Sequence, residues 1–318
     1  MRFAVIGTGA LSADVIAAGR ENGDFELACV CARSEKRARE MLASVGADAP
    51  VVRELAAVAA DASVDAAYVG APLPARFDEV MALLAAGKPV LAELPAAPCG
   101  DDYRRLAAAA AASGARFAEA ARALCTPGFA AVKTACAPLG ALRGAHFLFG
   151  ADDNGRPAAA APERTAAPLW ELACAGARTA IALFGAPDAV EGELRRRADN
   201  FETRLCAVLR FGDAQVRIDC SRTEALGRGA QLDFDGGSVL LDDADWPRLV
   251  RVRTADGERT VFTEDSPYAG TRQALARFAS PDSEDAQQAD LSAVADALRR
   301  ATGDDVPMAL PHVGGFVR

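Results

Sequence analysis

The sequence has few of the side chains that most often carry enzyme chemistry. It contains two histidines, His146 and His312, and only three of its 35 basic residues are lysines (Lys36, Lys88 and Lys133). It contains no run of about 18 uncharged apolar residues, so it predicts no membrane-spanning helix. The eight cysteines are scattered through apolar segments at spacings that fit neither a zinc site nor a redox pair. We therefore expect buried, reduced thiols and no metal.

The chain is also short of net positive charge. It carries 44 acidic and 35 basic residues, a formal charge of −9, which disfavours a general role in binding nucleic acid or an anionic membrane. The N-terminal stretch MRFAVIGTGA breaks its apolar run at a Gly-x-Gly and has no cleavage-site pattern. We interpret it as a first strand rather than a signal peptide, and expect a cytoplasmic protein.

The first 122 residues alternate apolar strands with helical patterns. Because the strands are apolar on both faces, the pattern predicts a doubly wound parallel α/β sheet of the Rossmann type, covered on both sides. The expected strands are 2–7, 25–32, 64–71, 89–93 and 115–120, and the expected helices are 11–22, 34–45, 75–87 and 100–114.

Residues 123–318 change character and predict a second, α+β domain. Short strands punctuated by Gly-Asp and Asp-Gly pairs follow one another between 189 and 264, which is typical of a large, open, mostly antiparallel sheet with one face in water. We expect an additional strand at 142–150 and helices at 127–136, 169–185 and 289–303. At 318 residues, two domains, 1–122 and 123–318, are the natural division.

A glycine motif stands between the first expected strand and helix. Gly7 permits a tight turn and Gly9 lets the backbone approach a pyrophosphate, with Thr8, Ala10 and Leu11 completing the loop. The helix that follows offers free N–H groups and a positive dipole end to the phosphates. The motif predicts dinucleotide binding; the alternative is a glycine turn in a doubly wound fold that has lost its ligand.

The end of the second strand indicates which dinucleotide is bound. An NAD site carries an acid there to hold the ribose hydroxyls, whereas this chain has Ala32, Arg33 and Ser34. The planar guanidinium of Arg33 suits a 2′-phosphate, so NADP(H) is favoured and NAD(H) remains possible.

Over essentially its whole length the chain resembles the Gfo/Idh/MocA family of oxidoreductases, named for glucose–fructose oxidoreductase and inositol dehydrogenase. The resemblance is carried by GTGALS, YVGAPLPARF, GKPVLAELP, EAARALCTPGF and LWELACAGARTAIALFGAP. It implies an NAD(P)-binding first domain, a small-molecule substrate, and a second-domain sheet that covers the active site with one face and often forms a homo-oligomer with the other. It also implies that Ala71, Pro72, Leu73, Glu93 and Leu94 join the cofactor site.

The chain departs from the family at its catalytic positions. Family members read Glu-Lys-Pro where this chain has Glu93, Leu94 and Pro95, and that lysine bonds the substrate oxygen as hydride moves. Glu171 and Ala175 occupy the positions of an Asp and an acid/base His or Tyr, four residues apart on one helix face. The resemblance implies a substrate pocket formed by Leu94, Trp170, Glu171, Ala175 and Arg178. Further replacements fall at Ala71, Leu73, Ala123, Leu124 and Thr126.

These departures leave roles and function open. Glu93 either holds its loop or touches the nicotinamide ribose, and Arg178 either grips an anionic substrate or pairs with Glu171 or another acid. Glu171, Tyr103 or a water are the candidate proton donors, with Glu171 the only candidate catalytic residue we name. One hypothesis is an NADP-dependent oxidoreductase acting on a small hydroxy, carbonyl or imine compound. The other is a cofactor-binding paralogue that has lost dehydrogenase chemistry and has a regulatory, scaffold or non-redox role.

Overall fold

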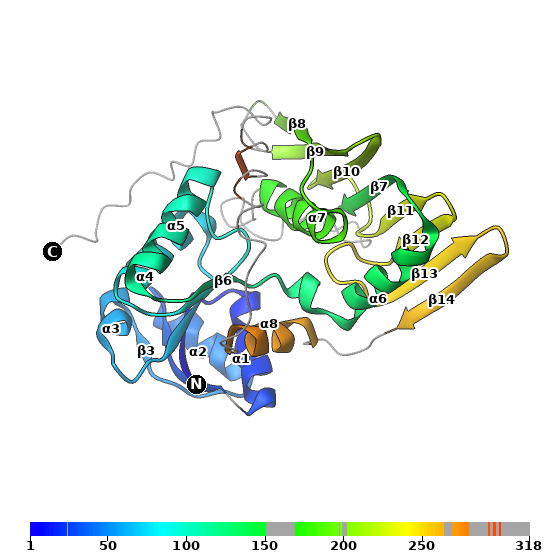
Figure 1. Ribbon diagram of the computed structural model, residues 1–318. Coiled ribbons are helices and arrows are strands. Elements are labelled where there is room, and N and C mark those ends of the chain that lie inside the picture. Colours follow the sequence, from blue (N-terminus) through cyan, green and yellow to red (C-terminus); the bar gives the residue numbers. More distant parts are fainter. Residues whose placement is uncertain are drawn as a thin grey trace.

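The computed structural model describes residues 1–23, 25–150, 169–196, 198, 202–263, 269–279, 292, 295, 296 and 299. Two sheets dominate it, one from each half of the chain, with the first sheet and its helices in blue to cyan and the second in green to yellow (Figure 1). This arrangement confirms the predicted combination of a Rossmann-type sheet and a second α+β sheet.

The first sheet has six parallel strands in the order β3-β2-β1-β4-β5-β6. Alternate residues of β1 enter different cores: Ala4 and Ile6 pack on one face of the sheet, Phe3 and Val5 on the other. Burial on both faces is the reason these strands read as continuous apolar runs. The strands are β1 (Arg2–Ile6), β2 (Glu26–Cys31), β3 (Val51–Val52), β4 (Ala66–Val69), β5 (Val90–Ala92) and β6 (Phe117–Glu119).

Helices cover both faces of this sheet. Residues of α1 and α2 belong to the core on the Phe3 side, and residues of α3, α4 and α5 to the core on the Ala4 side. The short pair β3 and α3, between 51 and 60, was not predicted, because a two-residue strand is too short to show a period. The helices are α1 (Ala10–Asn22), α2 (Glu35–Ser44), α3 (Leu55–Ala60), α4 (Leu73–Ala85) and α5 (Gly100–Ser113).

Two short 3-10 helices and one α-helix connect the sheets: η1 (Arg122–Cys125), α6 (Pro127–Cys136) and η2 (Ala137–Leu139). The Thr126 hydroxyl accepts a hydrogen bond from the Phe129 N–H (3.0 Å) and caps α6, with a proline at its first position. The predicted helix at 127–136 is confirmed.

The second sheet has eight strands in the order β14-β13-β12-β11-β7-β10-β9-β8. All its pairings are antiparallel except one, since β7 and β10 run parallel in its centre. This parallel pair was not predicted, because local periodicity carries no information about a partner some 70 residues away. The strands are β7 (Leu142–Phe149), β8 (Ala189–Arg196), β9 (Glu202–Phe211), β10 (Ala214–Ser221), β11 (Ala230–Phe234), β12 (Gly237–Leu241), β13 (Leu249–Thr254) and β14 (Gly257–Thr263).

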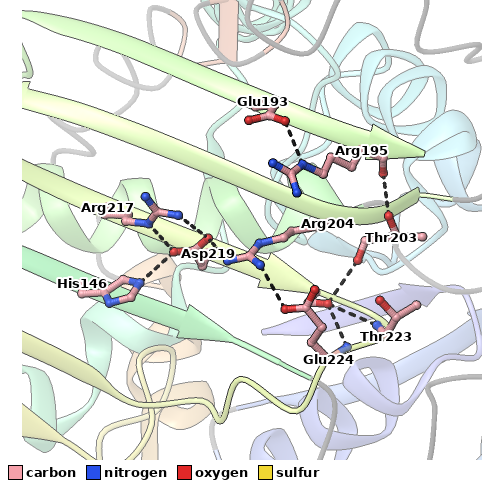
Figure 2. A network of polar contacts seen from close by, with 10 residues as sticks. His146, Glu193, Arg195, Thr203, Arg204, Arg217, Asp219, Thr223 and Glu224 are labelled. Atoms are coloured by element: carbon pink, nitrogen blue, oxygen red, sulfur yellow. Dashed lines mark hydrogen bonds and ion pairs between the residues drawn. The ribbon is translucent and has the colours of Figure 1, made fainter. Parts of the chain in front are cut away.

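Helix α7 (Leu169–Phe184) covers one face of this sheet. It approaches closely at Gly176, where a Cβ would lie 2.9 Å from the Phe149 ring and 3.0 Å from Ile218. The other face carries a polar network (Figure 2). There Asp219, 2% exposed, contacts His146 (2.8 Å), Arg204 (3.0 Å) and Arg217 (2.5 Å). Burial alone would raise the pKa of Asp219, but these hydrogen bonds lower it far below its usual value.

The chain returns to the first domain after the second sheet. Helix α8 (Ala269–Ala279) packs against α1 and η1, and Leu275 and Phe278 enter the core on the Phe3 side of the first sheet. The sequence analysis did not identify this helix. The helix predicted at 289–303 lies mostly outside the described residues. Within it, the carboxylate of Asp296 accepts a hydrogen bond from the Gly100 N–H (2.8 Å) at the start of α5.

All eight cysteines are free thiols, six of them buried and two half-buried, as expected. Among the described residues, no helix is both long and apolar enough to cross a membrane.

Candidate functional site

The glycine loop has the backbone that a dinucleotide requires. Gly7 has a φ of +106°, and a Cβ there would lie 3.0 Å from the Gly70 main chain, so only glycine fits. A Cβ on Gly9 would meet nothing within 4 Å, because this residue faces open space. Gly9 is also the N-cap of α1, and no side chain in the described part of the chain caps the helix. The first N–H groups of α1 are therefore open to a phosphate.

A shallow, open pocket of about 330 Å³ lies beside this helix terminus. It brings together Thr8, Gly9 and Ala10 from the predicted loop with α2. Leu11, which is 38% exposed, follows the loop. The complete lining is Thr8, Gly9, Ala10, Ala13, Arg37, Glu40, Met41 and Ser44.

Arg37 is a residue that the sequence analysis missed. Its N–H donates to the Ser34 hydroxyl (3.4 Å), which caps α2, and its exposed side chain reaches the pocket. Arg33 is also exposed, one residue before this cap, whereas Ala32 is buried at the strand end. Arg37 and the capped terminus of α2 thus lie beside the glycine loop, whereas the charge of Arg33 acts on Glu79 of α4. The sequence signal that could have identified Arg37 is its position three residues after Ser34, the expected N-cap of the helix.

The three residues after β4 have different environments. Ala71 is buried, and its carbonyl accepts a hydrogen bond from Arg76. Pro72 is exposed as the N-cap of α4. Leu73 is 1% exposed and belongs to the core of the second domain, so it joins the two domains.

The turn after β5 begins with Glu93, whose N–H donates to Val69 (2.9 Å). The buried carboxylate of Glu93 accepts a hydrogen bond from the Tyr68 hydroxyl (2.5 Å) and pairs with Arg122 (3.5 Å). Leu94 follows, half-buried, and its peptide bond to Pro95 is cis. The carboxylate of Glu93 is thus bonded to protein partners. Of its two expected roles, holding the loop and contacting the nicotinamide ribose, these contacts fit the first.

Arg76, in the first turn of α4, supports the same turn. Its Nε donates to the Ala71 carbonyl (2.9 Å), and its Nη1 donates to the carbonyls of Pro95 (2.6 Å) and Glu93 (3.4 Å). This arginine was not predicted, because nothing local marks an arginine whose main-chain partners include carbonyls 17 and 19 residues away.

Helix α7 presents Glu171 and Ala175 on one half-buried face, one turn apart as predicted. Burial raises the pKa of Glu171 to about 7, with the charge of Arg76 lowering it and that of Glu93 raising it. These couplings place Glu171 near the turn that contains Leu94. Trp170 lies in the first turn of α7, and its side chain is outside the described part of the structure.

Arg178, further along α7, forms an ion pair with Glu119 at the end of β6, and both side chains are at most 3% exposed. Glu119 also accepts hydrogen bonds from the Tyr103 hydroxyl (2.6 Å) and the Ala96 N–H (2.7 Å). Burial raises the pKa of Tyr103 well above its usual value. The sequence analysis left Arg178 either an anionic substrate or an acid of the protein as its partner. In the structure its partner is an acid, Glu119, and not Glu171.

The arrangement fits a nicotinamide dinucleotide at the carboxyl ends of the strands. The open terminus of α1, the shallow pocket beside it and Arg37 suit phosphates, and the turns after β1 and β4 flank the point where the strand order reverses. When bound, such a cofactor supplies or accepts a hydride. Glu171 holds a proton that can be exchanged near neutral pH.

Comparisons with known proteins agree with this geometry. The chain is 24% identical to a scyllo-inositol 2-dehydrogenase (NADP(+)) of Bacillus subtilis strain 168, over 81% of this chain and 80% of the relative. It superposes on a 3-ketoreductase from Actinomadura kijaniata in complex with NADP and TDP-benzene (TM-score 0.79, 20% identity, 95% and 98% of the two chains). It also superposes on a levoglucosan dehydrogenase in complex with NADH and levoglucosan (TM-score 0.80, 16% identity, 95% and 96%).

Residues 1–120 match the family model described as the oxidoreductase family with an NAD-binding Rossmann fold, Gfo/Idh/MocA. The match covers the first sheet, the glycine loop and the Glu93 turn, which are the parts from which the dinucleotide site is built. On this match, residues 1–120 belong to the NAD-binding Rossmann part of the Gfo/Idh/MocA oxidoreductase family, and the chain as a whole shares its fold with the two solved oxidoreductases.

Proposed function

We propose that this protein is an NADP(H)-dependent oxidoreductase that interconverts a hydroxyl and a carbonyl group on a small polyol or sugar-like compound. The observation that carries the cofactor assignment is the exposed Arg37 beside the glycine loop, with the exposed Arg33 directly before the cap of α2. No acid stands at the end of β2 to bond ribose hydroxyls, and a guanidinium fork binds a 2′-phosphate in two places.

The substrate class follows from the relatives. The proteins that the chain resembles are named for scyllo-inositol, a 3-keto compound and levoglucosan, two of them with NADP and one with NADH. Each of these names refers to a compound with a hydroxyl or a carbonyl group. Two of the compounds, scyllo-inositol and levoglucosan, are polyhydroxylated rings. A ring of this kind offers several hydroxyls for hydrogen bonds in addition to the reacting one.

Glu171 is the residue we assign to proton transfer. Its pKa of about 7 lets it give a proton to the substrate oxygen during reduction and take one during oxidation at neutral pH. Tyr103 is less suited, because its hydroxyl is buried and bonded to Glu119.

The function is tested by fluorescence titration with NADPH and NADH, followed by turnover assays. Wild-type protein should bind NADPH more tightly than NADH, and should reduce NADP⁺ with at least one member of a panel of inositols and pyranoses starting with scyllo-inositol. Failure of both dinucleotides to bind at millimolar concentration would remove the proposal.

The second candidate, a cofactor-binding paralogue without dehydrogenase chemistry, is favoured by Leu94 and Ala175, which lack the family's lysine and acid/base side chains. It predicts tight NADPH binding with no turnover on any panel member. Turnover abolished in Glu171→Gln would contradict it.

We also propose that the protein is a homo-oligomer formed through the face of the eight-stranded sheet opposite α7. That face carries Asp219 at 2% exposure beneath His146, Arg204 and Arg217, a burial unusual for a face in water (Figure 2). Light scattering on the purified protein decides between a monomer and an oligomer, and Asp219→Arg should dissociate the latter.

A further inference from the structure

The guanidinium of Arg76 lies against the main chain on both sides of Leu94. Its Nη1 donates to the carbonyl before that residue, at Glu93 (3.4 Å), and to the one after it, at Pro95 (2.6 Å). Its Nε is held by the Ala71 carbonyl (2.9 Å), and the residue is only 6% exposed. The cationic group is therefore fixed at the turn where this chain lacks its family's lysine.

The charge of Arg76 has no paired carboxylate. Within the described part of the chain, no acidic oxygen lies within the 4.0 Å of an ion pair, and its protein partners are three neutral carbonyls. The neighbouring arginines differ, since Arg178 pairs with Glu119 and Arg122 with Glu93. A buried charge without an opposite partner is costly, and a negatively charged oxygen of a ligand would compensate it.

One nitrogen of Arg76 is available for such a ligand. Nε and Nη1 are occupied, whereas Nη2 donates to no acceptor among the described residues. It is also absent from the fully enclosed, unpartnered polar atoms, so it keeps contact with solvent. Both hydrogens of Nη2 can therefore be donated to a bound molecule.

The acids around Arg76 leave much of its charge uncompensated. The charge of Arg76 acts on Glu171 of α7 and on Glu79 of α4, and burial raises the pKa of each to about 7. Both acids thus hold a proton in part of the molecules at neutral pH. Glu93, on the turn itself, is engaged with Tyr68 and Arg122.

We propose that Arg76 is a catalytic residue whose Nη2 donates to the substrate oxygen that gains negative charge during hydride transfer. It would thus take the role that the family assigns to the lysine replaced by Leu94. In reduction, the carbonyl carbon would take a hydride with its electron pair from the C–H bond of NADPH, which is oxidised to NADP⁺, and the carbonyl π pair moves to the oxygen. Arg76 stabilises that oxygen, and the proton of Glu171 moves to it, leaving a Glu171 carboxylate and an alcohol; oxidation is the reverse. This assignment rests on the proposed function.

The site is tested with formate, a small oxyanion, titrated by calorimetry into the full-length protein with and without NADP⁺. Wild type should bind formate in the millimolar range, and Arg76→Met should weaken binding by at least about tenfold, because a charge-assisted hydrogen bond is lost. Arg76→Lys keeps the charge and should recover part of the affinity. Equal binding by wild type and Arg76→Met, or no binding by wild type, would overturn the proposal.

A second pair of variants covers the case in which Arg76→Met does not fold. Leu94→Glu brings a carboxylate beside Arg76 and should bind formate at least about tenfold more weakly than its uncharged match, Leu94→Gln. Equal binding by this pair also contradicts the proposal. NADP⁺ titration of the same proteins separates the two hypotheses. If formate binds through Arg76 but no dinucleotide binds, the proposed function fails while the oxyanion site stands.

Discussion

Arg178 of α7 and Glu119 of β6 form a buried ion pair that joins the second domain to the first. The same carboxylate receives the Ala96 N–H from the loop after the cis-proline turn. The helix that carries Glu171 is thereby tied to the loop that follows Leu94. The relative position of the two halves of the site depends on this pair.

Loss of this pair should destabilise the protein strongly. Arg178→Met leaves the Glu119 carboxylate buried without its cation and should lower the free energy of unfolding by about 3–5 kcal/mol. Denaturant melts measure the loss. The double variant Arg178→Met/Glu119→Gln removes the charge and should recover part of it. A single-variant loss below about 1 kcal/mol would mean that the pair is not buried in solution.

The sequence predicted the first domain well because its signals are local. Apolar runs, a glycine turn and the Ser34 cap each depend on neighbouring residues, and the structure contains the strands and helices expected from them. The central parallel pair of β7 with β10 and the return of α8 to the first domain depend on distant partners, which no local pattern encodes.

The candidate site was predicted only where a motif marked it. The glycine loop and Arg33 were named in advance, but Arg37 and Arg76 were not. Arg37 lines the pocket only because α2 packs beside α1, and Arg76 meets the Glu93 turn only because β4 and β5 are neighbours. Both placements are products of tertiary structure.

Removal of either cofactor-site arginine should weaken NADPH binding selectively. Arg33→Ala and Arg37→Ala should each lower NADPH affinity by about tenfold or more while leaving NADH affinity within about twofold, because only NADPH carries the 2′-phosphate. Fluorescence titration measures both. Arg39→Ala is the matched control on α2, since Arg39 bonds the Ala49 carbonyl and does not line the pocket. An equal loss for both dinucleotides would argue against 2′-phosphate recognition.

Glu171 should make stability depend on pH in a predictable direction. Its pKa is about 7 in the folded protein and 4.5 without burial, so below about pH 4.5 it is neutral in both states. As pH rises towards 7, the unfolded chain releases this proton first, which favours unfolding. Glu171→Gln removes this effect, so the stability of the variant relative to wild type should rise by about 2–3 kcal/mol between about pH 4.5 and 8. Urea melts across this range measure it, and Glu79 contributes equally to both proteins. A difference that stays constant with pH would show that Glu171 titrates normally.

Restoring the family's lysine should distinguish the two functional hypotheses. If Arg76 already supplies the positive charge, Leu94→Lys places a second cation against the same turn. The two like charges repel, and turnover on any panel substrate should fall by about tenfold or more. Leu94→Met, similar in volume and uncharged, should keep most of the wild-type rate. If instead wild type is inactive and Leu94→Lys gains turnover, then the chain retains a dehydrogenase scaffold whose chemistry was lost at this one position. Steady-state NADPH assays on the three proteins, with NADPH affinity measured in parallel, separate these outcomes from a simple loss of cofactor binding.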